Sequence, residues 1–159
     1  MTSTFDKEDL HRTAAYWSEW QTTRQSKQQL YADWGDHPTV FNAVMRACFG
    51  NAQTDFFSYL NTHYPQCQNA HALSLCCGDG GFETQLIGKG VFKKITGIEI
   101  SPERIAHGSA QLNAQGLAQQ LNFLQQDVNQ GEFGESCFDV VFAKAALHHI
   151  ENLEQAFAG

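Results

Sequence analysis

The chain has 159 residues, of which 42% are hydrophobic, and its formal net charge is −7. This length and apolar content suit one globular domain, and the acidic balance disfavours a nucleic-acid ligand, because phosphate contacts need a basic surface. No run of about 18 apolar residues indicates a membrane span. The first residues carry neither the basic nor the apolar region of a secretory signal, so we expect a cytoplasmic protein without a membrane partner.

Residues 1–68 are expected to form a helical N-terminal extension. The segment Trp34–Pro38 is interpreted as a break, with Pro38 suited to the first turn of the helix that follows. Apolar residues then recur at amphipathic spacing as far as Gly50, which is a natural helix stop. A further helix is expected over about Thr54–Tyr64.

From residue 69 onward the pattern changes to alternating strands and helices. Four strands are expected, over Ala72–Cys77, Ile95–Ile100, Leu121–Leu124 and Phe138–Ala143. Helices are expected over Phe82–Lys89, from Ser101 to about Gly116, and over Asn152–Ala158. This alternation predicts an α/β fold with a Rossmann-like parallel sheet.

The ends of the first three strands carry residues that suit a nucleotide site. Gly78 and Gly80 follow the first strand, Glu99 ends the second, and Asp127 follows the third. The carboxyl ends of parallel strands meet at one edge of the sheet. There a glycine-rich turn admits a ligand, and a carboxylate can accept hydrogen bonds from ribose hydroxyls. A plain strand-to-helix turn is the alternative interpretation of the glycine stretch taken alone.

The position that would hold the third glycine of a dinucleotide fingerprint is occupied by Glu83. A carboxylate at the start of a helix disfavours a pyrophosphate, which a helix N-terminus would otherwise attract. The sequence therefore predicts a nucleoside ligand without phosphates. It disfavours the alternative of an NAD-dependent oxidoreductase.

Three stretches resemble the motifs of class I S-adenosylmethionine-dependent methyltransferases. Leu73–Gly80 is similar to LDLGCGxG, Ile95–Ile105 to VxGVDxSPxxL, and Phe138–Ile150 to the motif of the fourth strand. The resemblance implies S-adenosyl-L-methionine as the cofactor, a strand order of 3-2-1-4, and further strands beyond the fourth. On this basis residues 69–159 are expected to be a truncated core, whose open fourth strand suits self-association.

The resemblance also implies roles for single residues. Glu99 would bind the ribose hydroxyls, and Asp127 the adenine amino group, with Val128 nearby; a simple turn role for Asp127 is the alternative. The other implied cofactor-binding residues are Leu75, Cys76, Gly78, Gly80, Ile100 and Ala143. In similar enzymes an N-terminal extension covers the cofactor, so the Trp34–Pro38 break is a candidate lid; core packing of Trp34 is the alternative.

Two residues depart from the first motif. Ser74 replaces the usual acidic residue, which removes a carboxylate that would orient the glycine loop, and Cys76 replaces a usual glycine. Either change is expected to weaken cofactor binding. A non-catalytic cofactor-binding or assembly module is therefore an alternative function.

Methyl transfer from a sulfonium depends mainly on orientation, so no catalytic residue is assigned. His149 of the His148–His149 pair is a candidate general base for an acceptor that must lose a proton. The segment Ala143–Ala146 lacks the signature of DNA amine methylation, which favours a small-molecule acceptor. The five cysteines show no metal-ligand spacing and are expected to be reduced, buried thiols.

Overall fold

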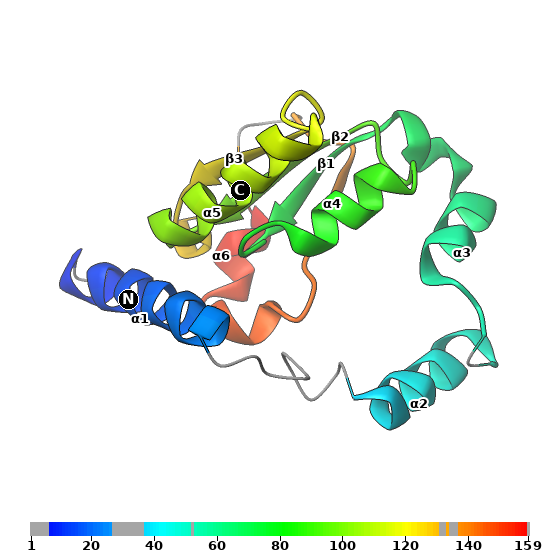
Figure 1. The fold of residues 1–159 in the computed structure, drawn as a ribbon, viewed down its shortest axis with the longest axis horizontal. Coiled ribbons are helices and arrows are strands. Elements are labelled where there is room, and N and C mark those ends of the chain that lie inside the picture. Colours follow the sequence, from blue (N-terminus) through cyan, green and yellow to red (C-terminus); the bar gives the residue numbers. More distant parts are fainter. Residues whose placement is uncertain (1–6, 27–36, 52, 131–132, 134–136, 159) are drawn as a thin grey trace.

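The protein is described from a computed structural model, which describes residues 7–26, 37–51, 53–130, 133 and 137–158. Within the described residues, the α-helices that precede the sheet are α1 (Lys7–Ser26), α2 (Pro38–Phe49) and α3 (Phe56–His63), and the last two lie where helices were predicted. A short 3-10 helix, η2 (Pro65–Asn69), leads into the first strand. In Figure 1, α1 lies below the helix α5 at the lower left, whereas α2 and α3 lie at the right of the view. Residues 34–36 of the candidate lid lie outside the described residues.

Local signals set the ends of α2. The His37 side chain accepts a hydrogen bond from the Thr39 backbone N–H, and Pro38 occupies the first turn of the helix, as predicted. Gly50 closes the helix with a left-handed φ of 77°. Asp55 caps α3 in a similar way, by accepting from the backbone N–H groups of Phe57 and Ser58.

The sheet is parallel and its strand order is β3-β2-β1-β4, which confirms the predicted order. The strands are β1 (His71–Leu75), β2 (Lys94–Glu99), β3 (Leu121–Gln125) and β4 (Val140–Phe142). Leu75 is in register with Ile98, and Glu99 with Gln125. The carboxyl ends of these strands therefore meet at one edge, while β4 is an outer strand of the described sheet.

Successive side chains of a strand point to opposite faces, and this alternation produces two cores. Ala72 and Ile95 face a cluster completed by residues of α4 (Gly81–Gly88) and α5 (Pro102–Gln115), the two helices in front of the sheet in Figure 1. Leu73, Leu75 and Ile98 face the second cluster, which includes Ala156 of α6 (Leu153–Ala158). The sheet is thus covered on both faces, as a parallel sheet requires.

The second crossover helix follows its prediction closely. Ser101 caps α5 by accepting from the Arg104 backbone N–H, Pro102 is the first helical residue, and Gly116 ends the helix at φ 71°. In the described part of the chain, no helix combines the length and apolar character needed to cross a membrane.

Two predictions about cysteines are wrong. The first strand does not extend to Cys77: β1 ends at Leu75, and Cys76 begins a turn with φ 53°. The thiols are free, as expected, but none is fully buried: Cys48 and Cys137 are exposed, and Cys67, Cys76 and Cys77 are half-buried.

Candidate functional site

The glycine loop, Cys76–Gly80, joins β1 to α4 and turns sharply. Cys76, Gly78 and Gly80 all have positive φ, at 53°, 65° and 75°. A Cβ on Gly80 would lie 2.4 Å from the Phe123 ring of β3, so this position requires glycine for both conformation and space. The Phe123 side chain of β3, which is separated from β1 by β2, therefore reaches the turn of the loop.

Glu99 holds this loop in place from the end of β2. Its side chain is 4% exposed, and Oε2 accepts a hydrogen bond from the Gly78 backbone N–H at 2.9 Å. Oε1 accepts from the N–H groups of Ile100 and Ser101, each at 2.9 Å. A carboxylate offers about four lone-pair sites, so these three bonds leave room for one more donor, such as a ribose hydroxyl.

The helix α5 presses against the glycine loop. A Cβ on Gly108 would lie 2.4 Å from the backbone oxygen of Asp79, and the His107 Nδ1 lies 3.5 Å from the Asp79 carboxylate. Gly108 was missed by the sequence analysis. The signal available was a lone glycine inside an otherwise regular helix, which often marks a close packing contact.

Asp127 lies just beyond β3 and is 9% exposed. Its Oδ1 accepts from the backbone N–H and the side-chain amide of Asn129, both at 3.0 Å. Its Oδ2 is buried and has no hydrogen-bond partner among the described residues. A buried carboxylate oxygen in this state favours a donor from a ligand, and the exocyclic amino group of adenine is such a donor.

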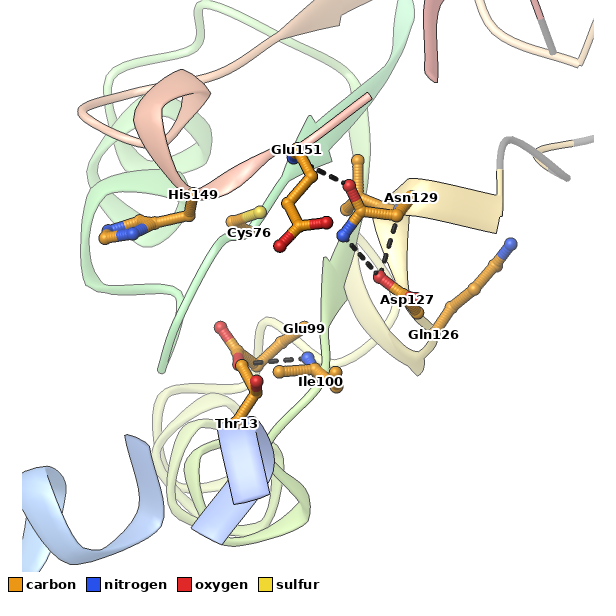
Figure 2. A pocket seen from close by; sticks show the side chains of 10 residues that line it. Thr13, Cys76, Glu99, Ile100, Gln126, Asp127, Asn129, His149 and Glu151 are labelled. Carbon is orange, nitrogen blue, oxygen red and sulfur yellow. Dashed lines mark hydrogen bonds between the residues drawn. The ribbon is translucent and has the colours of Figure 1, made fainter. Parts of the chain in front are cut away.

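A cavity of about 120 Å³ lies between these groups. Figure 2 shows that its lining comes from separate parts of the chain, including α1 and the segment after β4. Six predicted residues line it: Cys76, Glu99, Ile100, Asp127, Val128 and His149. Four lining residues were not predicted: Thr13, Gln126, Asn129 and Glu151. Thr13 and Glu151 come from segments that only the folded chain brings here, so no local pattern indicated them.

Four predicted site residues do not line this cavity. Leu75 is 1% exposed and belongs to the core beneath the sheet edge, and Ala143 packs against the same core. Gly78 and Gly80 lie in the glycine loop, where their positive φ values shape the turn of the backbone. These four residues therefore belong to the structure that surrounds the cavity and not to its lining.

Burial, followed by the nearby charges of Glu99 and Asp127, raises the pKa of the Cys76 thiol to about 12. The thiol is therefore protonated near neutral pH and fills space as a small apolar group. Burial and the neighbouring His148 and Arg104 lower the pKa of His149, which favours its neutral imidazole. The His149 ring also packs against Trp17 of α1, with 4.9 Å between ring centroids.

Ser74 stands where the first motif usually has an acidic residue. A carboxyl group from another element, α4, lies beside it. Ser74 Oγ donates a hydrogen bond of 2.6 Å to Oε1 of Glu83, in the first turn of α4, and the two residues are 1% and 2% exposed. The Ser74–Glu83 pair therefore ties together the two elements that flank the glycine loop. The Glu83 side chain is directed into the protein, toward Ser74. Its main role is therefore this contact, and not the repulsion of a phosphate at the helix start that the sequence suggested.

Among the described residues, no cluster of three or more His, Cys, Asp or Glu side chains is arranged to hold a metal ion.

Residues 72–159 match the sequence profile of the family described as "Methyltransferase domain". The chain is 30% identical over 88 residues to sterol 4-C-methyltransferase strm-1 of Caenorhabditis elegans, a match that covers 55% of this chain and 26% of that protein. The chain thus spans about a quarter of the length of this curated relative.

Two of the solved structures that share the fold illustrate its range. An S-adenosylmethionine-dependent methyltransferase from Mesorhizobium loti has a TM-score of 0.52 at 21% identity, over 63% of this chain and 44% of that chain. The [4+2]-cyclase SpnF has a TM-score of 0.56 at 19% identity, over 63% of this chain and 36% of that chain. The fold thus hosts more than one reaction, and these likenesses concern architecture alone. The family match covers more than half of the sequence, and the chain belongs to the methyltransferase-domain family, with the class I fold of the S-adenosylmethionine-dependent enzymes.

Proposed function

We propose that this chain binds S-adenosyl-L-methionine in the cavity at the strand ends and uses it to methylate a small-molecule acceptor. The observation that carries the proposal is the buried, unpartnered Oδ2 of Asp127, within the part of the chain described, in the same cavity as Glu99. These two carboxylates suit the two donor-bearing parts of adenosine, its adenine amino group and its ribose hydroxyls.

The chain's own residues have distinct tasks in this proposal. Asp127 would accept from the adenine amino group, and Glu99 would use its remaining lone-pair site for a ribose hydroxyl. The loop segment from Gly78 to Gly80 would lie along the methionine part. When bound, the cofactor supplies an electrophilic methyl group on a sulfonium, and the protein contributes orientation and exclusion of water.

A small-molecule acceptor is supported by two observations. The formal net charge of −7 disfavours a polyanionic substrate. The curated relative from Caenorhabditis elegans acts on a sterol, according to its name. The neutral imidazole of His149 at the cavity is suited to accept a proton from an acceptor hydroxyl or amine.

The direct test of binding is isothermal titration calorimetry of the chain with S-adenosylhomocysteine, with NAD as the competing nucleotide. We expect S-adenosylhomocysteine to bind and NAD not to bind. Binding of NAD alone would contradict the proposal. Turnover is tested separately, with radiolabelled S-adenosylmethionine and a panel of sterols, amines and phenols; binding without transfer to any acceptor would favour the non-catalytic alternative.

A further inference from the structure

One cationic side chain of α5 lies directly against the glycine loop. A Cβ placed on Gly78 would be 2.5 Å from a terminal guanidinium nitrogen of Arg104 and 3.0 Å from its Cζ. The guanidinium therefore occupies the space immediately beside the Gly78 backbone. The contacts of Gly108 and His107 with Asp79 fix α5 here, one turn further along the same helix.

The N-terminal helix covers this guanidinium. The Trp17 ring of α1 lies 5.4 Å from the Arg104 Cζ, which is a cation–π distance. The Ser18 hydroxyl lies 2.8 Å from the Ser101 hydroxyl and also donates to the Glu103 carboxylate, so α1 is attached to the start of α5. Trp17 is thereby positioned to limit the movement of Arg104.

The ligand group that suits this position follows from charge. S-adenosylmethionine carries one anionic group, the carboxylate of its methionine part, and the proposed function places that part along the glycine loop. A guanidinium is the protein cation best shaped to bind a carboxylate, through two parallel N–H donors. The acidic residues of the cavity, Glu99 and Asp127, cannot serve that group, because they would repel it.

Resting on the proposed function, we propose that Arg104 binds the carboxylate of the cofactor's methionine part, and that Trp17 holds the guanidinium in place. Arg104 is then a specificity-determining residue: it distinguishes ligands that carry the amino-acid group from ligands that carry only the adenosine and the sulfur.

The test compares S-adenosylhomocysteine with 5′-methylthioadenosine, which has the same adenosine and thioether but no amino-acid group. Calorimetry with Arg104→Gln should show roughly 10- to 150-fold weaker binding of S-adenosylhomocysteine, the range expected for hydrogen bonds to a charged group. Its affinity for 5′-methylthioadenosine should change by less than about twofold, since no carboxylate is lost. Arg46→Gln, at an exposed arginine in α2, is the matched control and should bind both ligands as the wild type does.

Equal weakening of both ligands, or unchanged binding of S-adenosylhomocysteine, would overturn the role of Arg104 while leaving the proposed function intact. A wild-type chain that binds neither ligand would overturn both. If Arg104→Gln does not fold, as judged by circular dichroism, Arg104→Lys replaces it. That variant keeps the cation but loses the paired donors, so selective loss of S-adenosylhomocysteine affinity would still be expected and equal loss would still be contradictory.

Discussion

The N-terminal helices and the sheet core are held in different ways. Within the described parts of α1, α2 and α3, Met45 is the only buried residue. Most of the other buried apolar side chains, such as Leu86 and Ile95, belong to the sheet and its covering helices. The helix α1 instead contacts α5 through the Ser18 hydrogen bonds and the Trp17 ring. Stability is therefore concentrated in the core, whereas α1 contributes Thr13 to the lining of the cavity.

The largest expected effect is a loss of stability when a glycine of the core is substituted. A glycine substitution in the N-terminal part should lower the free energy of unfolding less. Gly80→Ala should lower the free energy of unfolding by about 2–4 kcal/mol, because it combines a strained φ with a clash against Phe123. Gly50→Ala has a similar φ but no atom within 4 Å of the new Cβ, so it should cost about 1–2 kcal/mol. Urea unfolding measures both. Equal losses would show that packing against the glycine loop does not matter.

The next effect concerns ligand affinity. Glu99→Ala removes the acceptor for the Gly78 N–H and for a ribose hydroxyl, so S-adenosylhomocysteine binding should weaken by about 1–3 kcal/mol. Calorimetry at one salt concentration measures this loss. Glu154→Ala, at an exposed carboxylate of α6, controls for the change in net charge. Unchanged affinity in Glu99→Ala would argue against the ribose role.

A smaller effect should depend on pH. Burial raises the pKa of Glu83 above its ordinary 4.5, opposed by the Ser74 hydrogen bond and by Lys144, while Asp79 adds to the increase. A raised folded-state pKa gives stability that is fully present below the unfolded pKa and is lost as the pH rises through the folded pKa. Glu83→Gln keeps an acceptor for Ser74 but cannot ionise. The stability of Glu83→Gln relative to wild type should therefore increase with pH across this window.

Urea unfolding at several pH values between about 4 and 8 tests the Glu83 prediction. Glu154→Gln removes an exposed carboxylate and serves as the control. A constant difference between Glu83→Gln and wild type would contradict the assignment of the pH dependence to Glu83.

The smallest effect concerns the attachment of α1. Ser18→Ala removes the bonds to Ser101 and Glu103, which should weaken docking of α1 by about 0.5–1.5 kcal/mol without shifting the unfolding of the core. Hydrogen exchange of the α1 amides should accelerate accordingly. Ser58→Ala, whose hydroxyl bonds locally to Asp55 of the α3 cap, should leave α1 exchange unchanged. Slow exchange of α1 in Ser18→Ala would mean that other contacts hold this helix.

Much of the core could be predicted from the sequence because its signals are local. Ser101, Pro102 and Gly116 set the ends of α5 through capping and φ preferences that depend on immediate neighbours. The parallel sheet followed from the alternation of elements, and the strand order followed from the family resemblance. The end of β1 was predicted wrongly because cysteine suits a buried strand, whereas Cys76 adopts the positive φ that usually belongs to glycine.

The remaining features depend on long-range contacts. Ser74 indicated a missing carboxylate, but only the fold reveals that Glu83 is placed beside it. The helix α1 lies against the start of α5, so Ser18 bonds to Ser101, which is 83 residues further along the chain. The same placement of α1 brings Thr13 into the lining of the cavity. No spacing rule in a single sequence connects such positions, so the contribution of the N-terminal helix to the site could not be predicted residue by residue.

The central claim is that the cavity between Glu99 and Asp127 is the adenosine site. A crystal structure of the chain with S-adenosylhomocysteine tests it most directly. We predict the adenine amino group within hydrogen-bond distance of Asp127 Oδ2 and a ribose hydroxyl within hydrogen-bond distance of Glu99. An adenosine bound elsewhere, with Asp127 Oδ2 still lacking a ligand donor, would contradict the account.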